Sequence, residues 1–224
     1  MDSVTSFIYG MSMMFFSMMA FLFWRKGKEM LFRMIMWLMI VVDLQLVKDM
    51  VFFQIYGFDN EHAWYLTSSL DMMIIPFYSF VLMELVKPGW FRWVKALMLE
   101  LPFLLLPVFY IFTHNIIWFY VLSAWGAIYG FSTFILLFFM IRRYHRQLKE
   151  RFSYQENINL NWLLAILNTF FLILFLWTLS CFVINVDYDN IYMVSSLILW
   201  MLIDYFVYRH VSVIEELSDL EIVP

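Results

Sequence analysis

Two charged residues stand side by side in an apolar run of this sequence, and a third lies in the next apolar run. Lys48 and Asp49 occur in "LQLVKDMVFF" (44–53), and Asp71 occurs in "LTSSLDMMII" (66–75). Amine and carboxyl groups in such surroundings can pair with one another, bind a charged ligand or carry a proton. Which of these they do depends on the elements that hold them.

The composition is that of a membrane protein. Of the 224 residues, 64% are hydrophobic and only 14% are charged, whereas a soluble domain is about half apolar. A charged side chain at the centre of a bilayer costs roughly 2.5–3.5 kcal/mol on insertion scales, so it faces the bundle interior, a water-filled cavity or another charge. Lys48, Asp49 and Asp71 are therefore expected to point inward, away from lipid.

Seven segments are long and apolar enough to cross a bilayer as helices, which takes about 20 residues each. We therefore expect an all-α integral membrane protein, a bundle of seven transmembrane helices. Pro76 in the third segment, and Pro102 and Pro107 in the fourth, predict local kinks. The expected spans are residues 6–24, 33–56, 65–86, 96–113, 116–141, 161–184 and 191–208.

The basic residues indicate how the bundle is oriented. All of them except Lys48 fall on one side of the predicted spans, and the positive-inside rule makes that side cytoplasmic. The amino terminus is then outside and the carboxyl terminus inside, in a bacterial inner (cytoplasmic) membrane. Residues 1–208 are expected to form the membrane domain and residues 209–224 a cytoplasmic tail. The basic residues on that side are Arg25, Lys26, Lys28, Arg33, Lys87, Arg92, Lys95, Arg142, Arg143, Arg146, Lys149, Arg151 and Arg209.

The charges of the second and third spans are expected to meet. At 100° per residue, Gln45, Lys48 and Asp49 fall within one arc of about 100°. A short outer loop joins the two spans, so they are antiparallel neighbours with Lys48 and Asp71 at similar depths. We predict that Lys48 pairs with Asp71 and that Asp49 or Asp43 shares the network. Three acids then face one base, so at least one carboxyl needs a proton or another partner.

Two interpretations of this cluster remain open. It is either a polar pocket, open to the outside, that senses a ligand or a proton, or a buried ion-pair lock that fixes the register of the helices. Further polar residues of the third span lie on one arc of about 120° with Asp71. These residues are Thr67, Ser68, Tyr78 and Ser79. The candidate binding residues are Asp43, Gln45, Lys48, Asp49 and Asp71.

Two other features concern the inner half and the packing of the bundle. Asp204 in the seventh span could pair with Arg142 or Arg33 and couple the tail to the bundle, or it could be an acid solvated near the inner boundary. The "GAIYG" sequence gives the fifth span a small-xxx-small surface at Gly126 and Gly130. We expect this surface to pack within the bundle, with a homodimer as the alternative.

The motifs of common catalytic and metal sites are absent from the sequence. The seventh span has no Lys for a retinal Schiff base, and no Gly-x-Ser-x-Gly, phosphate loop or Cys cluster occurs. Asp59, Glu61, His62 and His114 could gather around a metal outside the membrane, but their spacing matches no strong pattern. We therefore expect neither an enzyme nor a cofactor.

Several long stretches resemble a known family. "LDMMIIPFYSFVLMELVKPGWF" (70–91), "RRYHRQLKERFSYQENINLNWL" (142–163) and "LWTLSCFVINVDYDNIYMVSSLILWMLIDYFVYRH" (176–210) are similar to the membrane part of AraC-type, helix-turn-helix transcription regulators of the Bacteroides group. The resemblance implies a seven-helix inner-membrane sensor whose last span leads to a cytoplasmic DNA-binding domain. It names no ligand, and the sequence ends at Pro224, before such a domain would begin.

Three functions follow as hypotheses. The first is a signal-sensing membrane domain that relays a ligand or a membrane state through its last helix. It would have the lipid bilayer and an unknown small molecule as partners, and would meet DNA only through a further carboxyl-terminal domain. The second is a small-solute or proton transporter that uses the Lys48 and Asp71 region. The third is a structural membrane anchor. Solute flux would favour the second, and a ligand-dependent gain in stability without flux would favour the first.

Overall fold

The computed structural model describes residues 3–27, 29–58, 60–151 and 161–220, with side chains except at 144–145, 147–151 and 208–220. Within these residues the chain consists of helices and short connections, without a strand. The elements are α1 (Ser3–Lys26), α2 (Met30–Tyr56), α3 (Glu61–Asp71), the 3-10 helix η1 (Met72–Ile74), α4 (Ile75–Val86), α5 (Trp93–Thr113), α6 (Ile117–Arg151), α7 (Asn161–Cys181) and α8 (Val186–Leu220).

Seven of these units, with α3, η1 and α4 counted as one, are long and apolar enough to cross a membrane. This confirms the predicted all-α, seven-helix protein and indicates a multi-pass membrane protein. The helices are longer than several of the predicted spans. Both α6 and α8 continue beyond the apolar part of their sequences, because charged residues outside the hydrocarbon can extend a helix whose backbone bonds are already formed.

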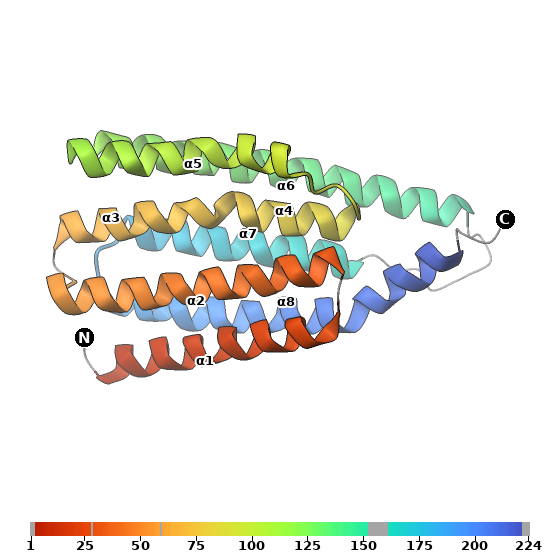
Figure 1. The fold of residues 1–224 in the computed structure, drawn as a ribbon, viewed down its shortest axis with the longest axis horizontal. Coiled ribbons are helices and arrows are strands. Elements are labelled where there is room, and N and C mark those ends of the chain that lie inside the picture. Colours follow the sequence, from red (N-terminus) through yellow and green to blue (C-terminus); the bar gives the residue numbers. More distant parts are fainter. Residues whose placement is uncertain (1–2, 28, 59, 152–160, 221–224) are drawn as a thin grey trace.

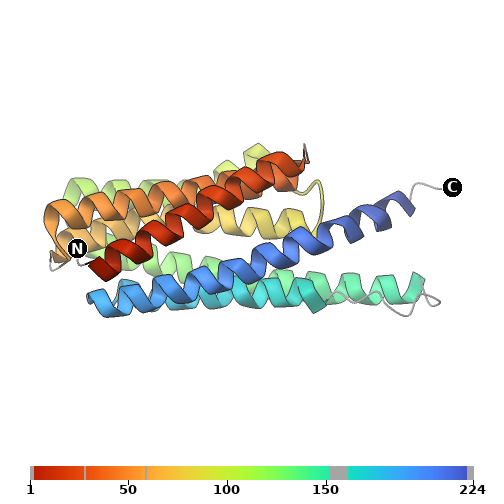
Figure 2. The ribbon, with the colours of Figure 1, turned by 90° about the horizontal axis from the view of Figure 1, so that it is seen from below.

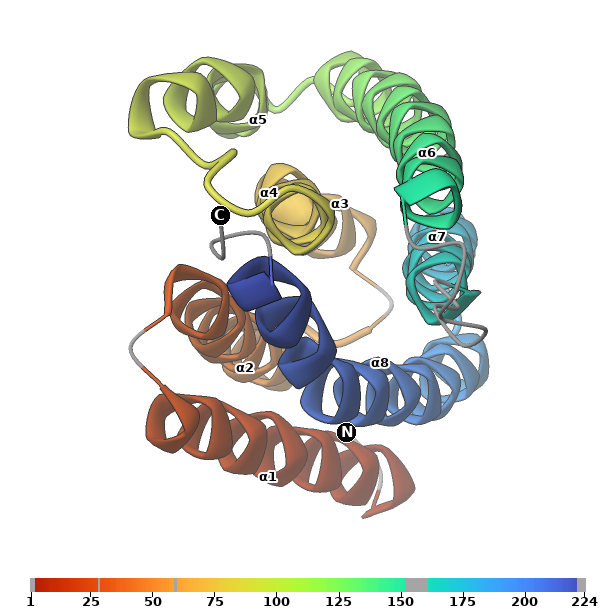
Figure 3. The same ribbon diagram turned by 90° about the vertical axis from the view of Figure 1, so that its right-hand side faces the viewer.

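The third unit occupies the middle of the bundle. Viewed from one end, α3 and α4 lie at the centre, with α2, α5, α6, α7 and α8 around them, and α1 packs outside α2 and α8 (Figure 3). The seven units run roughly along one direction (Figure 1). The third unit is also the most buried of the seven. Several polar side chains of α3 and α4 are therefore buried against other helices, namely Thr67, Ser68, Ser69, Ser79 and Glu84.

A 3-10 turn interrupts the third unit just before Pro76. The backbone N–H of Ile75 donates to the carbonyl oxygen of Met72, a tighter bond than the α-helical one. Pro76 has no N–H to continue the ladder and fits best at the start of a helix. The local irregularity predicted at Pro76 is thus a 3-10 turn in the residues just before it. In α5, by contrast, the helix runs continuously through Pro102 and Pro107.

A buried carboxylate stabilises the turn between α4 and α5. Glu84 accepts hydrogen bonds from the backbone N–H of Gly89 at 2.7 Å and of Phe91 at 2.9 Å. Gly89 has a φ of 77°, in the region that glycine adopts at least cost. Glu84 is buried. Its two oxygens accept from two backbone amides that would otherwise lack partners, so the carboxylate and the amides satisfy one another.

The glycines of α6 allow close packing inside the bundle. A Cβ at Gly126 would lie 3.2 Å from Ile75 Cδ1, and one at Gly130 would lie 2.8 Å from Leu174 Cδ2. Both contacts are with other helices of the same chain, α4 and α7. This confirms the prediction that the small-xxx-small surface packs within the bundle.

We expect Gly130→Leu to destabilise the bundle by about 1–3 kcal/mol, because the new Cβ would lie 2.8 Å from Leu174 Cδ2 and force that side chain to move. The matched control is Ala127→Leu, since Ala127 is exposed on the same helix. Thermal unfolding in detergent micelles measures both variants. Equal midpoints for the two would contradict the packing described here.

Candidate functional site

A cavity of about 150 Å³ lies inside the bundle, and every helix except α5 contributes described residues to its wall. Its volume is similar to that of an engineered protein cavity that admits benzene, about 150 Å³. Apolar side chains make up most of the wall, and polar groups are interspersed among them. The polar residues toward one end are Tyr9, Gln45, Asp49, Thr67, Ser68, Asp71 and Asp189.

Lys48 binds two of these carboxylates at once. Its Nζ lies 2.7 Å from Asp71 Oδ1 and 2.8 Å from Asp49 Oδ1, and it donates to the carbonyl oxygen of Thr67 at 3.0 Å. The three side chains are largely buried. The ammonium group thus donates hydrogen bonds to Asp71 and the Thr67 carbonyl and forms an ion pair with Asp49 as well. The structure thus contains the predicted pair of Lys48 and Asp71, and Asp49 shares it.

The other predicted members of the cluster have different positions. Gln45 Nε2 donates to the backbone carbonyl of Asp71 at 3.4 Å, so it supports the α3 side of the network. Asp43 instead accepts a hydrogen bond from Ser17 of α1 at 2.5 Å. Asp43 thus joins α2 to α1 and does not share the network of Lys48. Between the two alternatives that we allowed, the geometry selects Asp49.

A third carboxylate reaches the cavity from α8, and sequence analysis missed it. Asp189 accepts a hydrogen bond from the hydroxyl of Tyr9 at 3.1 Å, and both residues are buried. The expected seventh span began at residue 191, but the helix begins earlier, and Asn185 caps α8 by accepting from the N–H of Asp187 at 2.8 Å. An Asn followed by acidic residues is a signal for a helix start, and it would have placed Asp189 on the helix.

Aromatic rings form the wall farther along the cavity. The rings of Tyr78, Phe170 and Trp200 contact one another, with centroids 5.1 to 5.8 Å apart. Phe16 lies edge-on to Trp200 at 5.9 Å. At 1.5 Å per residue, Trp200 lies about 16 Å along α8 from Asp189. The cavity thus has an acidic end and an aromatic end.

The acidic end carries more carboxyl groups than amines. Asp49, Asp71 and Asp189 line the cavity, and the described lining residues contribute no Lys, Arg or His. Lys48 lies behind this surface and reaches two of the three carboxyls. A single ammonium cannot balance three carboxylates, so a cation or protons are needed to complete the charge of this end.

The predicted coupling pair in the inner half does not form among the described residues. Asp204 is buried, and neither carboxyl oxygen has a hydrogen-bond partner there. Arg142 is exposed and stands over the ring of Phe138 at 4.4 Å. Arg33 is exposed as well. The side chain of Asp204 points into the bundle, which the positions of these residues in the sequence did not reveal.

His62 and His114 pair with each other. His62 Nε2 and His114 Nδ1 are 3.2 Å apart, and the hydroxyl of Tyr110 is 3.0 Å from His62 Nδ1. Among the described residues, no group of three or more His, Cys, Asp or Glu side chains is arranged to hold a metal ion. Asp59, part of the set considered from the sequence, lies outside the described residues.

Comparison with protein-family models, with curated proteins and with solved structures gives no match for this chain. The features that bear on its function are the cavity, the helices that frame it and the charges within it. These features combine concave shape, an apolar wall and a few convergent polar groups. That combination is typical of a small-molecule site.

We expect Lys48→Met to lower the free energy of unfolding by about 3 kcal/mol, because it leaves two neighbouring buried carboxylates without their cation. The matched control is Lys87→Met, which removes an exposed Lys. Thermal unfolding in the same detergent gives the comparison. If both variants had the same midpoint and the same expression level, the ion pair would not stabilise the bundle.

Proposed function

We propose that this chain is the signal-sensing membrane domain of a transmembrane transcription regulator. A small molecule would enter the cavity between the helices, and the resulting change in the bundle would pass through α8 to a cytoplasmic DNA-binding domain. The cavity with its acidic and aromatic ends is the observation that carries this proposal. The resemblance of three long stretches to AraC-type membrane regulators supports it.

The course of α8 supports its role as the output. Its helix begins at Val186, lines the cavity with Asp189, Met193 and Trp200, and continues to Leu220. Beyond the membrane-spanning part it leaves the bundle as a single helix (Figure 2). The helix is continuous from the cavity to its far end, so a change in its position at the cavity would move the part that lies beyond the bundle. A ligand that favours one of two positions of α8 would shift their populations.

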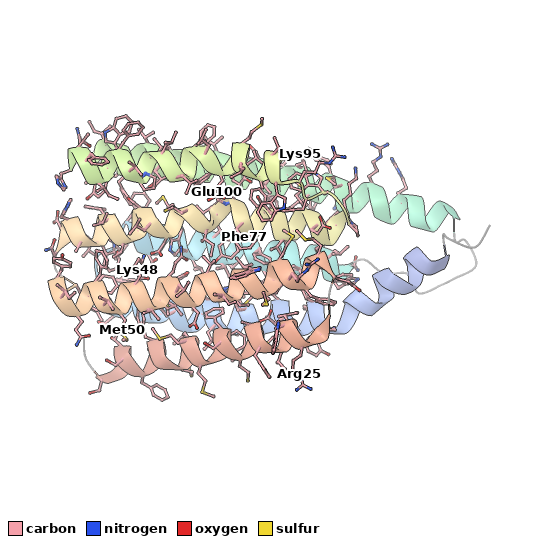
Figure 4. The ribbon with its side chains drawn as sticks, in the orientation of Figure 1. Arg25, Lys48, Met50, Phe77, Lys95 and Glu100 are labelled. Atoms are coloured by element: carbon pink, nitrogen blue, oxygen red, sulfur yellow. The ribbon has the colours of Figure 1, made fainter. Side chains whose placement is uncertain are left out.

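The orientation that we propose places the carboxyl end of α8 in the cytoplasm of a bacterial cell, with the inner membrane around the bundle. Arg25 and Lys95 lie at the end of the bundle toward which α8 leaves, and Lys48 lies in the opposite half (Figure 4). Other basic side chains, Lys87 and Arg142 among them, are exposed. The positive-inside rule assigns the end with most Lys and Arg to the cytoplasm.

Cysteine labelling tests this orientation. In a Cys181→Ala background, a membrane-impermeant maleimide should label Asp187→Cys in intact spheroplasts, because Asp187 is exposed at the outer end. It should label Lys87→Cys only after the membrane is permeabilised. Labelling in the reverse order would place the carboxyl end outside and overturn the sensor-to-cytoplasm route.

The size of the native polypeptide tests the regulator function. An antibody against residues 142–160 should detect, in cells of the source organism, a species well above the 27.3 kDa of this sequence. The added mass would correspond to the DNA-binding domain. A species at 27.3 kDa would contradict a covalently attached output domain and bring the transporter function forward.

The transporter has one specific observation in its favour. Asp204 is buried one turn beyond Trp200 on α8, with both carboxyl oxygens unpartnered among the described residues. A further acid beyond the aromatic end of the cavity would suit a cation or proton that continues toward the inner side of the membrane. Net uptake of a solute or protons into proteoliposomes would favour this function over the sensor.

A further inference from the structure

We propose that the cavity binds an amphiphilic organic cation, with its ammonium group at Asp189, Asp49 and Asp71 and its apolar body toward Tyr78 and Trp200. The inference rests on the proposed sensing function and specifies the chemical class of the ligand. It joins two separate observations, the excess of carboxyl groups at one end and the aromatic wall at the other.

Asp189 is the group that remains for a ligand. Asp49 and Asp71 both lie within 2.8 Å of Lys48 Nζ. Asp189 has the Tyr9 hydroxyl as its partner, a neutral donor. It lines the cavity with less than a tenth of its surface exposed. A buried carboxylate is stabilised most by a charged donor, and a ligand ammonium in the cavity would supply one.

The acidic end selects against the other ligand classes. A carboxylate or phosphate ligand would face three acidic side chains in a site of low dielectric, where repulsion between like charges is strong. The described residues of the wall include no Lys, Arg or His that could bind it, and Lys48 behind the wall is paired with Asp49 and Asp71. A neutral ligand would leave Asp189 without a charged partner.

The aromatic end determines the rest of the ligand. Tyr78 lies about 10 Å from Asp71 along the third unit, at 1.5 Å per residue, and its ring contacts Phe170 and Trp200. Aromatic faces attract both cations and the polarised C–H groups beside an ammonium, and they bury apolar surface. A cation whose apolar chain or ring extends about 10 Å from its nitrogen would reach from Asp71 to Tyr78.

The experiment uses the full chain in nanodiscs of phosphatidylcholine and three probes of the same skeleton, 4-phenylbutylamine, 4-phenylbutanol and 4-phenylbutanoate. We expect the amine to raise the thermal unfolding midpoint in a saturable way and the alcohol and the carboxylate to leave it unchanged. Stabilisation by the carboxylate, or equal stabilisation by amine and alcohol, would overturn the proposed ligand class. No stabilisation by the amine would overturn it as well.

A matched pair of variants locates the site. Asp189→Asn keeps an oxygen that can accept from Tyr9 but removes the negative charge, so we expect the dissociation constant of the amine to rise about tenfold or more. Asp187→Asn removes an exposed acid of the same helix turn and should leave it unchanged. If both variants raised the dissociation constant of the amine equally, or if neither changed it, binding in the cavity would be contradicted.

The same preparation separates this inference from the proposed function. If the amine binds and is also carried across the membrane of proteoliposomes, the ligand class stands and the sensor function fails. If the carboxylate or the alcohol alone stabilises the protein without flux, the sensor function stands and the ligand class fails. Binding of the amine without flux supports both.

Discussion

A charge within the apolar span of a bilayer must be matched inside the protein, and this constraint organises the interior around Lys48. The ammonium group takes its three partners from two helices, Asp49 on α2 and Asp71 and the Thr67 carbonyl on α3. Two of these partners lie on α3, so they hold α2 at one rotation and one height relative to α3. Apolar side chains alone can pack in more than one register of the two helices. A shift in register that separates a buried ion pair costs much more free energy.

The third unit lies at the centre of the bundle and contributes to both ends of the cavity. Asp71 ends α3 and faces Lys48, and Tyr78 on α4 faces Phe170 and Trp200. Between them the 3-10 turn ahead of Pro76 resets the angle between successive side chains. One unit therefore supplies a residue to the acidic end and a residue to the aromatic end. The surrounding helices complete each end with residues that lie far apart in sequence.

The sequence predicted those features that depend on period, length and depth. Seven apolar segments gave the seven helices, and equal depth on antiparallel neighbours gave the pair of Lys48 and Asp71. Asp189 was missed because hydropathy ends a span where polar residues begin, which put the start of the last helix after this residue. Tyr9 was missed because an uncharged tyrosine in an apolar run gives no sign of a polar role. The expected pair of Asp204 and Arg142 was drawn from position alone. Whether two such residues meet depends on how each helix is rotated about its axis, and that rotation depends on tertiary packing.

The cavity itself argues against a purely structural role. Filling an internal cavity with larger apolar side chains usually stabilises a protein, and replacing buried ion pairs by apolar residues is often neutral or stabilising. A membrane anchor would gain from both changes, yet this bundle keeps an open volume lined by three carboxyl groups. The residues that keep it open belong to most of the helices, including α8, whose helix continues beyond the bundle. The wall of the cavity includes Asp189 and Trp200 of this helix, about 16 Å apart along it, so a ligand bound at either end of the cavity would contact the helix that leads out of the bundle.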